Sequence, residues 1–314
     1  MLRYSARRTA HAVVVLFGVS VIVFIMLHLL PGSPARALLG PRATPAKVAA
    51  FNQQYGYNKP LFIQYFTWLW QMLQGNLGFS VKLNENVTTA IASRLPGTAL
   101  LVGLANLFAF VIAVPVGLMQ AARRNRFFDY VATGLAFVFY SMPAFWLGLL
   151  LVILFSEQLH LLPPIVPQAS FGQLLTHPGD IALPVITLTL ITTALFSRYM
   201  RSSALENLPL DYVRTARAKG MGGQQVLWRH VLRNAAGPLI TLVGLTLPVV
   251  VSGAILVESI FNYPGMGLLF WNAAQSEDYP TILGVTLVVG VATVVGSFIA
   301  DVLYAIVDPR VRLS

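Results

Sequence analysis

Residues 208–223 read L-P-L-D-Y-V-R-T-A-R-A-K-G-M-G-G and lie in a polar interval, 201–237, between two very hydrophobic segments. Asp211 is predicted to cap a helix, and Gly220 to end it, because glycine readily adopts the left-handed conformation found just after a helix. The helix would have about two turns, and a second helix is expected over 224–234. A helix this short is not stable alone in water, so it must dock on the rest of the chain or on a partner.

The side chains of the first helix divide into two sets. Tyr212, Val213 and Ala216 share one face at helical spacing, whereas Arg214 and Arg217 point elsewhere. The spacing therefore predicts an apolar docking face on an otherwise basic helix.

This stretch and the run W-R-H-V-L-R-N-A at 228–235 resemble the cytoplasmic coupling loop of ABC importer permeases, specifically the B-type permease subunit of dipeptide and oligopeptide importers. The wider superfamily has Glu-Ala-Ala and a later glycine here. When the chain is aligned on Gly220, Arg214 and Thr215 take the places of the glutamate and the first alanine. Ala216 and Gly220 match the second alanine and the glycine of the superfamily. These departures fit the peptide branch; the alternative is a basic inner loop of another membrane protein. The resemblance implies that an ATPase subunit contacts Asp211, Tyr212, Val213, Arg214, Thr215, Ala216, Arg217, Ala218, Lys219 and Gly220.

Composition identifies an integral membrane protein. Of 314 residues, 56% are hydrophobic and 10% are charged, whereas charged residues make up about a quarter of a soluble domain. The formal net charge of +10 is spread through short loops, which argues against a nucleic-acid partner. The chain has no cysteine, which excludes disulfides and thiolate chemistry. Its 5 histidines lack the spacing of metal ligands, so no metal site is expected.

Hydrophobic runs long enough to cross a bilayer predict an all-α membrane protein. The six transmembrane helices are expected at 12–30, 98–120, 130–155, 181–199, 239–257 and 281–306. We interpret the first as an uncleaved span rather than a signal peptide, because Pro31-Gly32-Ser33-Pro34 does not resemble a cleavage site. Pro143 is expected to loosen the third span.

The chain is expected to have three parts: a cytoplasmic N-terminus and first span (1–30), an external segment (31–95) and a core (96–314) that contains the coupling loop. In the external segment, Thr44-Pro45 and Gly56 predict a short polar helix. The aromatic run 61–73 is too short to cross the membrane. It either lies at the membrane interface or packs against other spans.

Basic side chains predict the orientation. Most of the 21 lysine and arginine residues fall on the same side as the N-terminus, and positive charge favours the cytoplasm. Both termini and the interval 201–237 are therefore expected to face the cytoplasm.

Two carboxylates are expected at membrane depth, Glu258 and Asp301. They lie on opposite sides and cannot act as an acid and base pair. Asp301 either pairs with an inner arginine or serves transport, and Glu258 either has a structural role or touches an outer gate or donor protein. The threonines of the fourth span either line a polar path or form hydrogen bonds with backbone groups inside the helix bundle. The candidate substrate path contains Asn106, Ser141, Thr189, Thr193 and Glu258.

No phosphate-binding G-x-x-x-x-G-K-[ST] motif occurs. The chain is therefore not expected to be an enzyme or to hold a cofactor. Uphill transport would need a separate cytoplasmic ATPase.

The resemblance to the peptide permease subunit covers nearly the whole chain. Its blocks occur in the same order: L-P-G-T-A-L-L from Leu95, A-V-P-V-G from Ala113, S-M-P-A-F-W-L-G-L from Ser141, V-E-S-I-F-N-Y-P-G-M-G-L-L from Val257, D-Y-P from Asp278 and D-V-L-Y-A-I-V-D-P-R-V-R from Asp301.

The family implies the type I ABC importer permease fold in the bacterial inner membrane. It also implies a second permease, two ATP-binding cassette subunits that hold ATP and Mg²⁺, and an extracytoplasmic peptide-binding protein. Relatives carry peptides, nickel chelates, glutathione or other small solutes. A self-sufficient secondary transporter, with a helix broken at Pro143 and Gly148, and an intramembrane enzyme are the alternatives from other classes.

Overall fold

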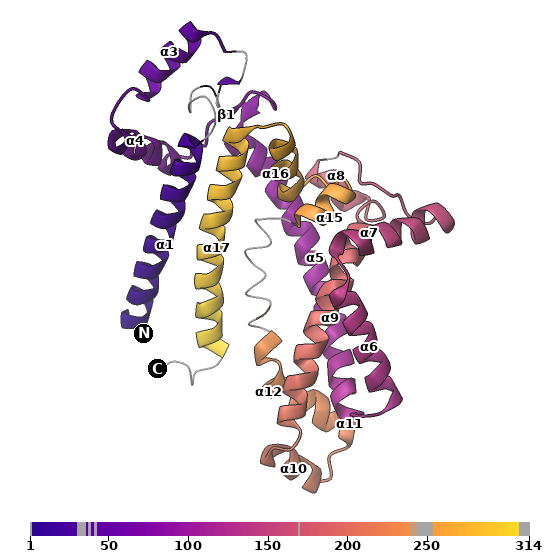
Figure 1. Ribbon diagram of the computed structural model, residues 1–314. Coiled ribbons are helices and arrows are strands. Elements are labelled where there is room, and N and C mark those ends of the chain that lie inside the picture. Colours follow the sequence, from indigo (N-terminus) through magenta and orange to yellow (C-terminus); the bar gives the residue numbers. More distant parts are fainter. Residues whose placement is uncertain are drawn as a thin grey trace.

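The computed structural model describes residues 2–29, 36, 39–40, 43–168, 170–239, 242 and 254–307. These residues are mostly helical (Figure 1). One two-stranded antiparallel pair is an exception to the all-α prediction: β1 (Phe79–Ser80) and β2 (Glu85–Asn86) pair with Phe79 opposite Asn86. The prediction of a helical membrane protein is otherwise confirmed for the described part.

Three described helices are long and apolar enough to cross a membrane. They are α5 (Val87–Ala122), α9 (Ala182–Asn207) and α17 (Tyr279–Val307). Helices α5 and α17 contain the predicted spans 98–120 and 281–306, and α9 begins one residue after the start of the predicted span 181–199. Helix α5 begins earlier than the predicted span, so the expected boundary at 95/96 falls inside a continuous helix.

The third predicted span is not a single straight helix. Helix α6 (Phe127–Ser141) and the following pair α7 (Ala144–Val152) and η1 (Ile153–Gln158) meet at a bend of 104°. Proline disfavours a helical conformation in the residue before it and provides no N–H, and Met142 is accordingly extended, with φ −71° and ψ 130°. The weak point was predicted at Pro143, but the size of the bend was not.

The core of the molecule is the crossing of α5 and α9. A Cβ atom on Gly117 would lie 2.6 Å from the Cβ atom of Met200 and 2.7 Å from the carbonyl oxygen of Ser197. A larger residue at 117 would therefore separate the two helices.

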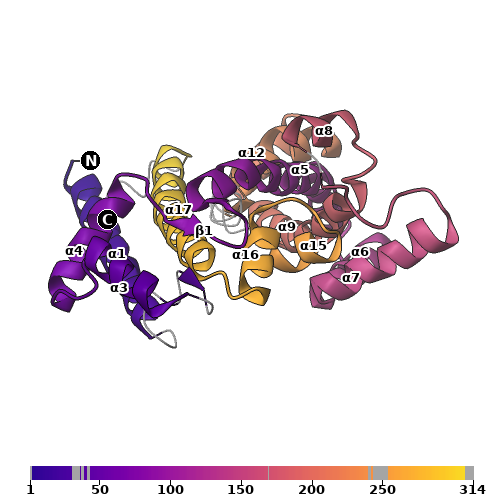
Figure 2. The ribbon, with the colours of Figure 1, turned by 90° about the horizontal axis from the view of Figure 1, so that it is seen from above.

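The N-terminal part contains α1 (Leu2–His28), α3 (Pro45–Tyr55) and α4 (Leu61–Leu73). Thr44 caps α3 and Gly56 ends it with φ 72°, as predicted. Seen along two directions, α1 stands beside α17, away from α6 and α7 (Figures 1 and 2). In α1 the described apolar stretch is Val13–Met26, and its crossing of the membrane stays a prediction.

The two ends of the molecule carry different short elements (Figure 1). At one end, here the α10 end, lie α10 (Asp211–Ala218), α11 (Gly223–Val226), η2 (Leu227–Val231) and α12 (Leu232–Ala235). Near the opposite end lie the strands, α8 (Phe171–Thr176), α15 (Ile255–Ile260) and α16 (Met266–Gln275). Most of the fifth predicted span, 239–257, falls outside the described residues.

Candidate functional site

Helix α10 has the predicted length but a different start. Leu210 occupies the N-cap position with extended backbone angles, and Asp211 is the first helical residue. The prediction that Asp211 caps the helix is therefore wrong. Its side chain is almost fully exposed and pairs with Arg214 at 3.4 Å. The carboxylate still favours the helix, because negative charge in the first turn stabilises the N-terminal end of the helix dipole.

The end of α10 follows the prediction. Gly220 has φ +80°, and the N–H of Gly220 donates to the carbonyl of Arg217 at 2.9 Å. The N–H of Met221 donates to the carbonyl of Ala216 at 3.2 Å. These two bonds form a Schellman motif, which satisfies carbonyl groups that the helix leaves free.

The apolar face of α10 is docked on the ends of α5 and α9, as the spacing predicted. Val213 is 0% exposed and Ala216 is 5% exposed. The Tyr212 hydroxyl donates to Asn207 Oδ1 at 2.8 Å and links α10 to α9. The docking cluster contains Val114, Leu118, Ala121, Met200, Ala204, Val213, Ala216, Val226, Leu227, Val231, Ala235 and Leu239. Burial in this cluster explains how two turns of helix stay folded.

The second helix of the loop was predicted at 224–234 and is found at 223–235, with a π-helical turn at Leu227–Val231. Four of its residues belong to the docking cluster. Both helices of the loop are thus held by one apolar cluster.

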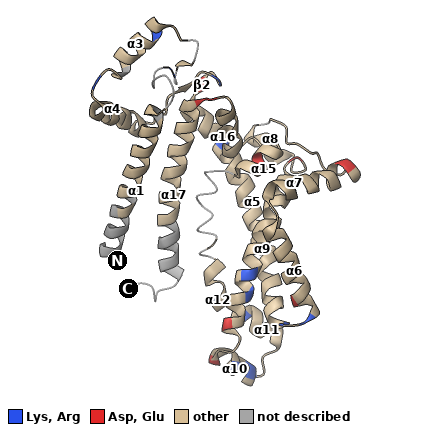
Figure 3. Ribbon diagram, in the orientation of Figure 1, with Lys and Arg blue, Asp and Glu red and all other residues tan. Residues whose placement is uncertain are grey.

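The other face of α10 is exposed and basic (Figure 3). Arg217 also lines a groove of about 760 Å³ together with Arg123 and Arg124 of the turn between α5 and α6. Groups of this kind suit an acidic or polar protein surface. This arrangement can bind a partner protein and transmit the movement of that partner to α5 and α9. The described residues at this end do not form a group with the side chains of a catalytic site.

An ion pair near this end was missed by sequence reasoning. Arg201 Nε donates to Asp129 Oδ1 at 2.7 Å and its Nη2 donates to Oδ2 at 2.9 Å. The N–H of Asn125 also donates to Asp129, at 3.0 Å. Asp129 is buried, with 3% of its side chain exposed. The pair fastens the start of α6 to α9, the helix that leads into α10. The signal in the sequence was a carboxylate in the first turn of an apolar run.

Of the candidate path residues, Thr189 lies at the contact of α5 and α9, and Thr193 lines a pocket between α9 and α6. Thr189 is buried and donates to the carbonyl of Ala105 at 3.5 Å. The side chain of Asn106 donates to the carbonyl of Val102 at 2.8 Å. Asn106 Oδ1 and Thr193 Oγ1 are buried without a hydrogen-bond partner among the described atoms. Ser141 is exposed at the bend after α6. Their contact with substrate stays a prediction.

Glu258 belongs to α15 and is fully buried, with 0% exposed. Its carboxylate faces the N-terminal end of α16. Oε1 accepts from the Thr98 hydroxyl at 3.0 Å and the Ala254 N–H at 3.2 Å. Oε2 accepts from the N–H groups of Gly267 at 2.7 Å and Leu268 at 3.1 Å. Four hydrogen-bond donors satisfy the Glu258 carboxylate, so this conformation favours a structural role for Glu258. A role of Glu258 in the substrate path stays a prediction. The Asp301 side chain lies outside the described part, so neither of its proposed roles is tested.

Glycine permits the close approach of this loop to Glu258. A Cβ atom on Gly267 would lie 2.7 Å from the Cα atom of Ile255, and one on Gly265 would collide with the carboxylate itself. The two glycines of the block N-Y-P-G-M-G are thus required by the packing around this buried carboxyl group.

We expect Glu258→Gln to lower the free energy of unfolding by about 2 kcal/mol. The side-chain amide nitrogen of glutamine would face a backbone or hydroxyl donor, so two buried donors would lack an acceptor. The melting temperature of the purified protein measures this. Glu277→Gln, at an exposed position in the following turn, is the matched control. Equal melting temperatures for the two variants would contradict the assigned role.

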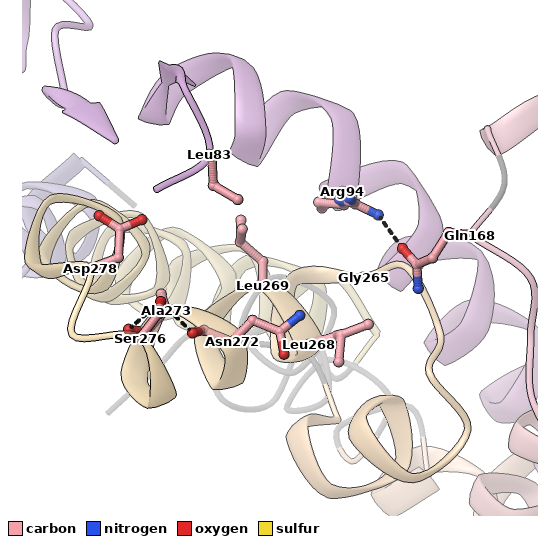
Figure 4. A pocket seen from close by; sticks show the side chains of 10 residues that line it. All are labelled: Leu83, Arg94, Gln168, Gly265, Leu268, Leu269, Asn272, Ala273, Ser276 and Asp278. Carbon is pink, nitrogen blue, oxygen red and sulfur yellow. Dashed lines mark hydrogen bonds between the residues drawn. The ribbon is translucent and has the colours of Figure 1, made fainter. Parts of the chain in front are cut away.

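A small pocket of about 80 Å³ lies beside this loop (Figure 4). Arg94 donates to Gln168 Oε1 there at 3.2 Å, and Asn272 and Ser276 lie on the opposite wall. The Asp278 carboxylate accepts from the hydroxyls of Ser80 and Thr281. The two bonds to Asp278 connect β1 to the start of α17. Within the described residues, no group of three or more His, Asp or Glu side chains could hold a metal ion.

The chain is similar to known membrane components of transport systems. The family of binding-protein-dependent transport system inner membrane components matches residues 113–313, and the N-terminal domain described for such components matches residues 1–102. A Brucella suis protein that carries the name of a peptide permease is 43% identical over 100% of both chains. The oligopeptide transport system permease protein AppB of Bacillus subtilis is 38% identical over 99% of this chain and 100% of its own length.

Among solved structures, a chain of the MetNI methionine ABC transporter in inward-facing conformations has a TM-score of 0.52. It covers 69% of this chain and 96% of its own length at 18% identity, which supports the fold alone. The family match extends over most of the chain, including α10 and its docking cluster. This chain belongs to the family of binding-protein-dependent transport system inner membrane components.

Proposed function

We propose that this chain is a transmembrane permease subunit of an ATP-driven importer of dipeptides or oligopeptides. The observation that carries the proposal is α10: a short helix held by an apolar cluster on α5 and α9, with its basic face free for a partner. The names of the two relatives support peptides as the substrate class. Nickel chelates, glutathione or another small solute are the alternative substrates.

In this proposal six helices cross the bacterial inner membrane, with both termini and α10 in the cytoplasm. A second permease subunit completes the translocation path. Two ATP-binding cassette subunits hold ATP and Mg²⁺, and an extracytoplasmic binding protein delivers peptide. The five candidate path residues Asn106, Ser141, Thr189, Thr193 and Glu258 belong to this proposal as well.

The proposed mechanism is alternating access. Closure of the ATPases around ATP moves α10, and α9 and α6 move with it because the docking cluster and the Asp129–Arg201 pair connect them. ATP binding drives this change only if the ATPases hold α10 more tightly in one state than in the other. Hydrolysis then returns the path to its inward-facing state.

Reconstitution tests the function. Proteoliposomes that contain this chain, a second permease and both ATPase subunits should take up labelled peptide when ATP and binding protein are present. Liposomes that contain this chain alone should take up none. The bend of 104° in the α6 and α7 pair is the feature that a secondary transporter would use. Uptake by the chain alone, without ATP, would overturn the proposal in favour of that class.

A further inference from the structure

Helix α4 exposes a face that is almost entirely apolar. Its sequence, LFIQYFTWLWQML, contains no charged residue. Phe62 is 72% exposed, Trp70 61% and Leu73 72%, and Leu61, Ile63 and Phe66 are exposed beside them. Thr67 also lies on this surface, but its hydroxyl donates to the carbonyl of Ile63 at 2.9 Å. A surface of this kind is rare on a protein face that meets water.

The opposite face of α4 is fixed to α1 by polar and aromatic contacts. The hydroxyls of Tyr65 and Ser20 lie 2.8 Å apart, and Gln64 Oε1 lies 2.9 Å from His28 Nε2. The Tyr65 ring packs edge-on against Phe24, with centroids 5.3 Å apart. These contacts set the rotation of α4 about its axis, so its apolar face cannot turn inward.

Helix α4 lies near one end of an apolar helix (Figure 1). It lies beside the end of α1 that is remote from the N-terminus (Figure 1). That end follows the apolar stretch Val13–Met26, which itself exposes Ile22, Ile25 and Met26. Helix α4 and this end of α1 thus both expose apolar side chains. An open groove of about 590 Å³ runs among Phe62, Phe66 and Trp70.

We propose that α4 lies in the interfacial layer of the bilayer, with Phe62, Phe66 and Trp70 against the lipid acyl chains. The occupant of this face is the phospholipid surface. Aromatic side chains are favoured at this depth because they are apolar yet tolerate the headgroup region. Exposed Lys59, just before α4, is placed to meet phosphate groups. The contact would anchor the segment between α1 and α5, on the external side in the proposed orientation.

Site-specific fluorescence tests this inference, and the natural chain has no cysteine that would need removal. Single cysteines replace Phe62, Trp70 and, as the matched control on a polar exposed helix, Gln53 of α3. Each variant of the full-length chain is labelled with an environment-sensitive dye in its assembled transporter, in phosphatidylcholine nanodiscs. Co-elution with the partner subunits identifies the folded variants.

We expect labels at 62 and 70 to emit at shorter wavelength than the label at 53. They should lose fluorescence when the lipids carry acyl-chain spin labels and should be insensitive to iodide. The label at 53 should show the reverse. Quenching of 62 and 70 by iodide would overturn the inference. Protection of both positions from lipid and iodide would overturn it too, because a protein would then cover this face. Neither result depends on the transported solute.

Discussion

Replacing Ala216 with glutamate is expected to abolish transport while the assembled complex retains basal ATP hydrolysis. Ala216 is 5% exposed and packs in the docking cluster with Val213 and Met221. An unpaired carboxylate in this cluster would cost several kcal/mol, so α10 would leave its site on α5 and α9. The ATPases would then act on a helix that is no longer connected to the membrane core. Rates of ATP hydrolysis and of peptide uptake, with and without binding protein, are measured in proteoliposomes.

Ala49→Glu is the matched control for this substitution. Ala49 is exposed on the short helix α3, far from the α10 end (Figure 1), and we expect its variant to transport at the normal rate. Size-exclusion chromatography of both complexes separates loss of coupling from loss of assembly. Normal uptake together with normal stimulation of ATP hydrolysis in an assembled Ala216→Glu complex would refute the coupling role of α10.

Arg201→Ala is expected to destabilise the protein by roughly 3 kcal/mol, because it leaves the buried Asp129 carboxylate without its partner. Removing both charges, in Asp129→Leu with Arg201→Met, should cost less, since no unpaired charge remains. Melting temperatures of the single and double variants measure the difference. Transport should also fall in Arg201→Ala, because α6 would no longer follow α9.

A second aspartate–arginine pair provides the control. Asp211 and Arg214 lie 3.4 Å apart with 96% and 73% of their side chains exposed, and an exposed pair contributes little to stability. Arg214→Ala should therefore leave the melting temperature unchanged. If Arg201→Ala and Arg214→Ala shift the melting temperature equally, the Asp129 pair is not the structural link described here.

Local patterns in the sequence predicted the short elements well. The start and end of α3 and the end of α10 depend on the single residues Thr44, Gly56 and Gly220, whose preferences act within one turn. The apolar face of α10 also followed from spacing alone, because residues three and four apart share one side of a helix. The start of α10 did not: Leu210, not Asp211, is the N-cap.

The site at the α10 end was only partly predictable. The sequence indicated α10 and its basic residues, but α5 and α9, which supply its docking surface, are separate spans in the sequence. The bend of 104° between α6 and α7 was also undetermined, because proline weakens a helix without specifying its new direction.

Local sequence patterns were sufficient to predict the membrane class, the described long helices α5, α9 and α17, and the short helix α10 with its two faces. The partners of the buried carboxyl groups became visible only in the folded chain: Asp129 bonds Arg201, 72 residues away, and Glu258 bonds Thr98, 160 residues away. The difference arises from the range over which the interactions act. Helix propensity and capping act between neighbours along the chain, whereas the stability of a buried carboxylate depends on donors that packing brings from distant segments.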